Sequence, residues 1–144
     1  MKIPFFNYPR LYLDNKEIFL KTVDEVASRG SFIMQKDLTS FENRIAKYVN
    51  SKFSFGVANA TDGLEIGWMA LGIKPGDEII CSAHTMVATA SAIKMAGGTP
   101  VPVDIGEDNL IDSCAVEEAI NHRTVGIMPT QLNGRTCNMD KIME

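Results

Sequence analysis

The sequence lacks several signatures that would assign a function directly. It has no run of 18 or more apolar residues, the length that a membrane-spanning helix needs. Its start shows no sustained apolar stretch followed by a small-residue cleavage site, so no secretory signal is expected. These absences predict a cytoplasmic protein without a membrane partner. The GxGxxG fingerprint and the GxxxxGK phosphate loop are also missing, which excludes those two classes of nucleotide-binding loop.

Cysteine and histidine are scarce. The three cysteines, Cys81, Cys114 and Cys137, lie far apart, without a CxxC pair and without ligand-like spacing to His84 or His122. This pattern predicts reduced structural thiols and no metal site. With 14 basic and 18 acidic residues, the net charge is −4 and no basic stripe is present, so nucleic acid is not an expected partner.

Two helices are predicted in the first third of the chain. Residues 15–30 carry apolar side chains at helical spacing and end at Gly30, a natural stop. A second helix is predicted from residue 36 or 37 to about residue 50, with Thr39 as its capping residue. Its predicted buried stripe consists of Phe41, Ile45, Ala46 and Val49.

From residue 53 onward, strand-like and helix-like runs alternate. The predicted strands are 53–59, 78–81, 99–105 and 124–130, and the predicted helices are 62–72, 85–98, 113–123 and one that begins near residue 138. Short connections between such elements are typical of an α/β domain with a mainly parallel sheet and helices on both faces. Since the chain stops shortly after its last helix begins, we expect a truncated domain.

Three loops follow the predicted strands: "NATDG", "SAHTM" and "TQLNGRT". In open α/β sheets, ligands bind beyond the carboxyl ends of the strands. The first loop is the best anion site, because Thr61 and Asp62 offer backbone N–H groups at a helix N-terminus and Gly63 allows close approach. Plain N-capping by Thr61, without a ligand, is the alternative for this loop. For His84 the alternative is a helix-capping or packed histidine.

The motifs in chain order are "NATDGL", "LGIKPGDEII", "HTMVATASAI", "GGTPVPVDI", "NLID" and "TVGIMPTQLNGRT" followed by "NMD". Their combination resembles the N-terminal part of the DegT/StrS-type sugar aminotransferases. The resemblance implies a fold type I, aspartate-aminotransferase-like large domain and the cofactor pyridoxal 5'-phosphate (PLP). Residues 1–35 would form an N-terminal arm and helix. Residues 36–144 would form the first part of the PLP-binding domain, with the remainder and the C-terminal domain absent.

The resemblance also implies cofactor-binding residues. Thr61 and Asp62 are expected to bind the PLP phosphate through backbone N–H groups and the Thr61 hydroxyl. The position of Met86 usually carries an aromatic ring that stacks on the pyridine ring. Methionine is a departure from that pattern, so His84 is a candidate substitute, although a thioether can also lie against a π-face.

Substrate contacts are implied at three further positions. Gln35, in a segment that begins at Ile33, and the loop from Gln131 to Asn133 match positions near the substrate in the family. Gln35 replaces a more usual glycine and Gln131 a frequent histidine. These differences are expected to influence which sugar is accepted.

The family's catalytic lysine, which forms the Schiff base, and its aspartate partner of the pyridine nitrogen lie beyond the matched region. Lys74 and Lys94 match neither position, so no catalytic residue is assigned and the chain alone is expected to be inactive. The full-length protein is expected to transfer an amino group from glutamate to a keto group of a nucleotide-linked sugar, as a homodimer. The alternatives are a PLP-dependent sugar dehydratase of the same family and an inactive fragment that acts only as a binding module. A small flavodoxin-like module is less consistent with the truncated end.

Overall fold

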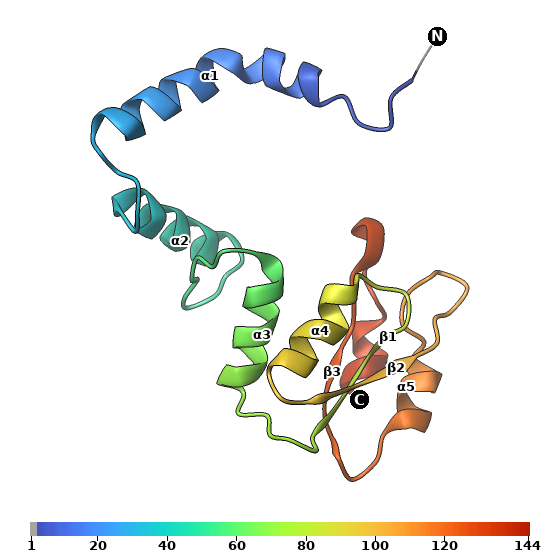
Figure 1. The fold of residues 1–144 in the computed structure, drawn as a ribbon. Coiled ribbons are helices and arrows are strands. Elements are labelled where there is room, and N and C mark those ends of the chain that lie inside the picture. Colours follow the sequence, from blue (N-terminus) through green and yellow to red (C-terminus); the bar gives the residue numbers. More distant parts are fainter. Residues whose placement is uncertain (1–2) are drawn as a thin grey trace. The chain divides into compact units, whose positions relative to one another are not determined.

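A computed structural model describes residues 3–144 (Figure 1). The chain divides into two compact units, one ending at Gly56 and the other beginning at Val57. The predicted division between residues 35 and 36 stays a prediction. None of the helices in the described part of the chain combines the length and apolar character that a bilayer crossing requires.

The first unit opens with helix α1, Tyr8–Ser28. It begins seven residues earlier than predicted. The Asn7 side chain accepts a hydrogen bond from the Arg10 backbone N–H, and Pro9 occupies the first turn, where its missing N–H has no cost. The predicted stop is confirmed, because Gly30 adopts a left-handed conformation with φ +65° just beyond the helix.

Helix α2, Lys36–Tyr48, follows. Thr39 is not its capping residue, as the sequence predicted, because the helix begins three residues earlier with Gln35 at the N-cap. Of the predicted stripe, only Ala46 is buried, and Phe41 and Val49 are more than half exposed. The stripe needs a partner surface that residues 3–56 do not supply.

Residues 53–59, predicted as a strand, form no strand in the described part of the chain. A strand exists only through pairing, and this run has no paired neighbour there. Instead, the Gly56 N–H donates to the Glu42 carboxylate of α2 at 2.7 Å. A Cβ at Gly56 would lie 2.6 Å from a Leu38 methyl group, so a larger residue here would require the Leu38 side chain to move.

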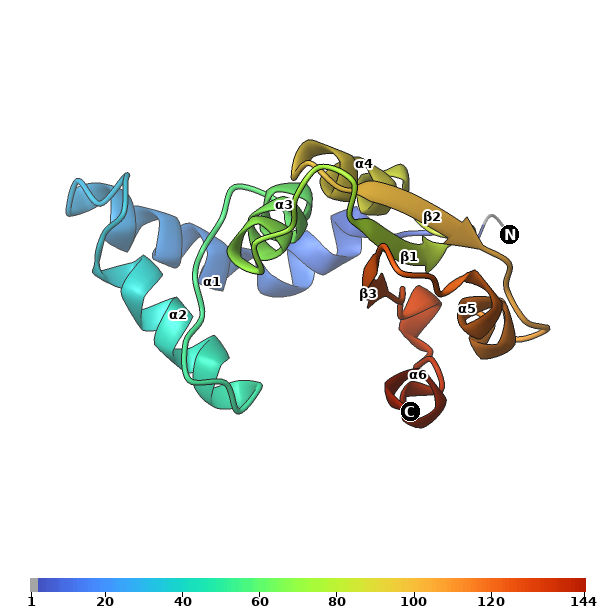
Figure 2. The ribbon, with the colours of Figure 1, turned by 90° about the horizontal axis from the view of Figure 1, so that it is seen from below.

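The second unit is an α/β layer structure (Figures 1 and 2). Its elements are α3 Ala60–Ala70, β1 Glu78–Ser82, α4 Val87–Met95, β2 Thr99–Val103, α5 Ser113–Ala119, β3 Thr124–Met128, the 3-10 turn η1 Leu132–Gly134 and α6 Met139–Met143. The three strands are parallel in the order β2-β1-β3. The strand order reverses at β1, which makes the gap between β1 and β3 the topological switch point.

Apolar clusters cover the two faces of this sheet. On one face, Ile79 and Cys81 of β1 and Ile93 of α4 are fully buried, and Trp68 of α3 packs against them. On the other face, α5 and the loops pack on β1, and the buried residues are Ile80, Val103, Leu110, Ile111, Val116 and Cys137. Figure 2 shows α3 and α4 on one side of the strands and α5 and α6 on the other. The predicted parallel sheet with helices on both faces is therefore confirmed.

Strand β2 carries proline at every second position, Pro100 and Pro102. The residues that alternate with them face β1: the Thr99 N–H donates to the Asp77 carbonyl, and the Val103 carbonyl accepts from the Ala83 N–H. The two prolines therefore point their missing N–H groups away from β1. This placement is why prolines do not interrupt the strand.

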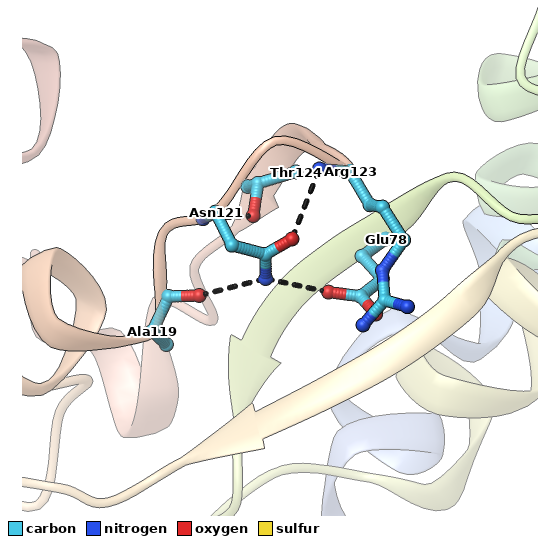
Figure 3. A network of polar contacts seen from close by, with 5 residues as sticks. All are labelled: Glu78, Ala119, Asn121, Arg123 and Thr124. Atoms are coloured by element: carbon cyan, nitrogen blue, oxygen red, sulfur yellow. Dashed lines mark hydrogen bonds and ion pairs between the residues drawn. The ribbon is translucent and has the colours of Figure 1, made fainter.

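A polar network joins the start of β1 to the turn before β3 (Figure 3). The Glu78 carboxylate forms an ion pair with Arg123 at 2.6 Å and accepts a hydrogen bond from the Asn121 amide at 2.8 Å. Next to this network the register between β1 and β3 shifts by one residue. Glu78 pairs with Thr124, whereas the following residue, Ile79, pairs with Gly126. The network therefore holds the turn at the place where the register changes.

Gly126 of β3 lies directly under the Trp68 ring. A Cβ at this position would lie 2.8 Å from the ring. The Trp68 indole N–H donates to the Met128 sulfur at 3.3 Å, which fixes the ring on the sheet. A rigid ring cannot yield as a flexible side chain does, so this contact requires glycine.

We expect Gly126→Ala to lower the free energy of unfolding by about 1–3 kcal/mol, because the methyl group would overpack against Trp68. Gly67→Ala is the matched control. A Cβ at Gly67 meets nothing within 4 Å, and alanine favours a helix over glycine by about 0.5–1 kcal/mol, so this variant should be slightly stabilised. Urea unfolding of both variants checks the pair, and equal midpoints would contradict the contact with Trp68.

We expect Glu78→Ala to cost about 1–3 kcal/mol of unfolding free energy, since it removes the carboxylate that Asn121 and Arg123 share as an acceptor. Glu118→Ala, at an exposed position of α5, should change the stability by less than about 0.5 kcal/mol. Thermal unfolding of the two variants provides the comparison. A loss as small for Glu78→Ala as for the control would show that the network does not stabilise the sheet.

Candidate functional site

The N-terminus of α3 is capped by Asn59. Its side-chain oxygen accepts from the Asp62 N–H at 3.0 Å, and its amide donates to the Asp62 carboxylate at 2.9 Å. The alternative of capping by Thr61 is therefore wrong, because Thr61 is already the second residue of the helix. The spacing of Asn59 and Asp62 is that of a capping box, so the sequence itself carries a signal for this helix start.

This cap determines which backbone N–H groups of the turn remain free to bind an anion. The first N–H groups of a helix have no intrahelical acceptor, and the helix dipole makes their surroundings positive. The Asp62 N–H is engaged by Asn59, which leaves the N–H groups of Ala60 and Thr61. Thr61 is half-buried, with its hydroxyl beside them in sequence. The role of Asp62 at the phosphate stays a prediction, and it requires the Asn59 side chain to turn away.

The loop after β1 carries His84 and Met86. The Ser82 hydroxyl accepts from the His84 N–H at 3.2 Å, which turns the chain at the end of the strand. Met86 is the N-cap of α4 and is 73% exposed. His84 is exposed and precedes the cap, so the alternative of a capping or packed histidine does not describe it.

Hydroxyl groups connect this loop to the loop after β3. Thr85 Oγ1 lies 2.8 Å from Thr89 Oγ1 of α4 and 2.8 Å from Thr130 Oγ1. The Thr130 carbonyl in turn accepts from the Cys137 thiol at 3.4 Å. The carboxyl ends of β1 and β3 are thus held together by side chains at the switch point.

The loop after β3 folds back on itself. Gln131 Oε1 accepts from the Cys137 N–H at 2.6 Å, and its amide lies 3.4 Å from the Met139 sulfur. Asn133 and Gly134 both have positive φ values, +53° and +75°, which reverse the chain within η1. The Gln131 side chain therefore supports the loop, while Asn133 lies at its tip.

The loops that follow β1, β2 and β3 surround one hollow of about 210 Å³, lined by His84, Asp108, Asn109, Leu132, Asn133 and Arg135. Thr61 and Asp62, at the start of α3, are not among its lining residues. It brings together two predicted site residues, His84 and Asn133. Met86 and Gln131 are not among its lining residues. Asn109 and Arg135 were not predicted, although both follow strands of a parallel sheet, where the sequence could have indicated them.

The remaining predicted residue, Gln35, belongs to the unit that ends at Gly56. It is exposed at the N-cap of α2, in extended backbone with φ −96° and ψ 178°. Its side chain makes no capping hydrogen bond. Its predicted role near the substrate stays a prediction.

The thiols of the described residues are free, with Cys81 and Cys137 buried and Cys114 exposed. Burial raises the pKa of the Cys81 thiol above its ordinary value, so it stays protonated and is a poor nucleophile at neutral pH. Within residues 3–144, no three His, Cys, Asp or Glu side chains gather as a metal site would require.

The sequence profile of the DegT/DnrJ/EryC1/StrS aminotransferase family matches residues 13–144. The chain is 36% identical over 145 residues to the 3-oxo-glucose-6-phosphate:glutamate aminotransferase of Bacillus subtilis, covering 99% of this chain and 33% of that protein. It is 39% identical over 121 residues to the UDP-2-acetamido-2-deoxy-3-oxo-D-glucuronate aminotransferase of Pseudomonas aeruginosa, covering 83% and 34% respectively. The chain thus spans about a third of the length of these curated relatives.

Solved structures agree with this match. The crystal structure of DesV from S. venezuelae, in complex with a ketimine intermediate, superposes with a TM-score of 0.94 at 32% identity, covering 99% of this chain and 38% of that one. NtdA from Bacillus subtilis, with bound cofactor PMP, superposes with a TM-score of 0.92 at 36% identity, covering 98% and 33%. The predicted fold type I architecture is confirmed.

We expect Asn59→Ala to lower the stability of the second unit by about 1 kcal/mol, since the Asp62 N–H loses its cap. Asn59→Ser should retain most of the stability, because a hydroxyl also caps well and places no second carboxylate beside that of Asp62. Thermal unfolding monitored by circular dichroism measures both. Equal losses in the two variants would contradict a capping role for the Asn59 oxygen.

Proposed function

Because the chain belongs to the DegT/DnrJ/EryC1/StrS aminotransferase family, we propose that the full-length protein is a PLP-dependent sugar aminotransferase. It transfers an amino group from glutamate to a keto group of a nucleotide-linked sugar. The observation that carries this proposal is the family match over residues 13–144. This range contains the loops that follow β1, β2 and β3 at the carboxyl edge of the sheet.

The names of the relatives support the substrate class. Glutamate is named as the amino donor of the Bacillus subtilis relative, whose sugar carries a 6-phosphate. Other relatives are named for sugars linked to UDP, dTDP or GDP. The shared chemistry is a keto sugar bearing phosphate, and the nucleotide-linked form recurs among them.

The N-terminus of α3 fits a cofactor phosphate. It offers the N–H groups of Ala60 and Thr61, the Thr61 hydroxyl and the positive end of an 11-residue helix. Gly63 has only a Val57 methyl within 4 Å of where a Cβ would stand, so the turn stays open. We propose that Thr61 binds the phosphate, and that Asp62 contributes when Asn59 releases its N–H.

PLP, when bound, supplies an electron sink for the carbon that gains or loses the amino group. The residues of this chain hold and orient the groups around that chemistry. Met86, more than two-thirds exposed at the start of α4, is proposed to lie against the pyridine ring through its thioether. His84, on the wall of the hollow, is the second candidate for that contact. The catalytic lysine is assigned to a part of the protein beyond this chain.

For the substrate we propose contacts from Asn133 and Gln35, and an indirect role for Gln131. Asn133 lies at the tip of the β3 loop and lines the hollow. Gln131 shapes this loop through its bond to Cys137, so it positions Asn133. Gln35 is exposed and makes no capping hydrogen bond, which leaves its amide available.

We also propose a homodimer that works in the cytoplasm. Large apolar side chains are exposed along α1, among them Leu11, Ile18, Phe19 and Val23, and a surface of this kind is typical of one that is covered in an assembly. Free thiols without disulfides suit a reducing compartment.

The test uses the full-length protein that contains this chain. Its intact mass is measured, and its visible absorbance is followed after PLP is added and again after glutamate is added. We expect a covalently bound cofactor and its glutamate-dependent conversion to the amino form. A bound cofactor that glutamate leaves unchanged would favour the dehydratase. No binding at all would leave only a binding module and overturn the proposal.

We expect Thr61→Val to weaken PLP binding by about tenfold to a hundredfold, because a hydrogen bond to a charged group contributes about 1.5–3 kcal/mol. Thr39→Val, on the exposed side of α2, is the matched control and should bind PLP as the parent does. Equilibrium titration monitored by absorbance gives both dissociation constants. Parental affinity in Thr61→Val would remove Thr61 from the phosphate site.

We expect Met86→Tyr to bind PLP about twofold to tenfold more tightly, since an aromatic pair contributes about 0.5–1.5 kcal/mol beyond its buried area. The same titration measures it, and His84→Ala tests the other candidate. If Met86→Tyr leaves the affinity unchanged and His84→Ala lowers it, His84 makes the ring contact and the assignment to Met86 is wrong.

A further inference from the structure

Arg135, like Arg44, has no ion pair among the described residues, but Arg135 also lines the hollow. Arg10, Arg29 and Arg123 each form an ion pair with a carboxylate. Arg135 forms none within residues 3–144. Its guanidinium donates instead to the backbone carbonyl of Asp108 at 2.6 Å. The neutral carbonyl fixes the position of the guanidinium without cancelling its charge.

The one carboxylate of the hollow is engaged in its own loop. Asp108 Oδ1 accepts from the Leu110 N–H at 3.0 Å, within the turn that follows β2. Arg135 therefore meets the main chain of Asp108, while the Asp108 side chain closes the turn. A guanidinium carries five N–H donors in a fixed fork, and the carbonyl of Asp108 engages only one of its nitrogens.

The other polar groups of the hollow can also donate hydrogen bonds. Asn109 and Asn133 bring side-chain amides from two different loops, and both residues have positive φ values, +64° and +53°. His84 brings an imidazole from the third loop. The guanidinium, two amides and an imidazole form a set of donors that suits an oxyanion.

The size of the hollow limits what enters it. About 210 Å³ is less than the roughly 300–1,000 Å³ of sites that enclose a whole small molecule. It is large enough for one charged group at the end of a ligand. The hollow also lies at the carboxyl edge of the sheet, beside the switch point between β1 and β3, where ligands of open α/β sheets bind.

We propose that Arg135 is a substrate-binding residue that recognises an oxyanion group of a substrate in this hollow, assisted by Asn109. The inference rests on the proposed function and deepens it by naming the residue that selects an anionic substrate. The oxyanion is either a phosphate of the keto sugar or a carboxylate of glutamate. Both are planar or tetrahedral oxyanions that a guanidinium fork binds through two hydrogen bonds.

The experiment compares Arg135→Met, Arg135→Lys and the parent, each as full-length protein loaded with PLP. Steady-state kinetics give kcat and a KM for each of the two substrates. We expect Arg135→Met to raise one KM by roughly tenfold or more while kcat stays within about twofold, and Arg135→Lys to lie between it and the parent. Arg44→Met, an exposed arginine of α2 without an ion pair in the described chain, is the matched control and should behave as the parent.

The two sources of the oxyanion are separated by which KM rises. A higher KM for the sugar alone identifies the phosphate, and a higher KM for glutamate alone identifies the carboxylate. Inorganic pyrophosphate and glutarate are the corresponding binding probes, measured by calorimetry without turnover. The probe that matches the affected substrate should bind the parent and lose about tenfold in affinity in Arg135→Met.

Two outcomes would overturn this inference. One is a set of KM values and probe affinities within twofold of the parent in both Arg135 variants. The other is a fall in kcat with both KM values unchanged, which would indicate that Arg135 only supports the loop. Thermal unfolding checks that each variant is folded, and Arg135→Lys keeps the test open if Arg135→Met unfolds. A parent that transfers no amino group from glutamate defeats the proposed function, whereas the pyrophosphate and glutarate titrations still test Arg135.

Discussion

The second unit depends on the pairing of β1 with a parallel neighbour on each side. All five residues of β1 are buried, and its side chains alternate between the Ile79–Cys81 cluster and the cluster around Ile80. Because β2 and β3 run parallel to β1, their carboxyl ends lie at one edge, and the three following loops meet there. The hollow at this edge therefore depends on β1, although no residue of β1 lines it.

Two positive regions with different origins characterise a chain whose net charge is −4. At α3 the positive potential comes from backbone N–H groups, whose direction is fixed by the Asn59 cap. In the hollow it comes from a side chain, Arg135, held by a backbone carbonyl. The first kind of site tolerates many side chains, since every residue except proline supplies a backbone N–H. The second depends on a single residue, and this makes it the place where relatives with different substrates can diverge.

Much of this arrangement follows from the sequence, because hydrophobic alternation and glycine stops are local signals. They predict β1, β2, β3 and the stop at Gly30, and the position of His84 and Asn133 after strands predicts that they meet. The run 53–59 has the apolar pattern of a strand but forms none, because strand pairing is a long-range property that the local pattern does not show. Arg135 follows β3, so the sequence could have placed it at this edge, but not the group that holds it. A guanidinium held by the carbonyl of a residue 27 positions away leaves no trace in local spacing.

The prolines of β2 determine where this sheet can grow. An incoming strand needs N–H donors on the free side of β2, and Pro100 and Pro102 remove two successive ones from that side. That border is therefore closed to strand addition, including the intermolecular pairing that begins aggregation. β3, whose five residues include no proline, keeps its donors on its outer side. Any further strand of this sheet is thus directed to the β3 side, so the two borders have opposite roles: one terminates the sheet and the other continues it.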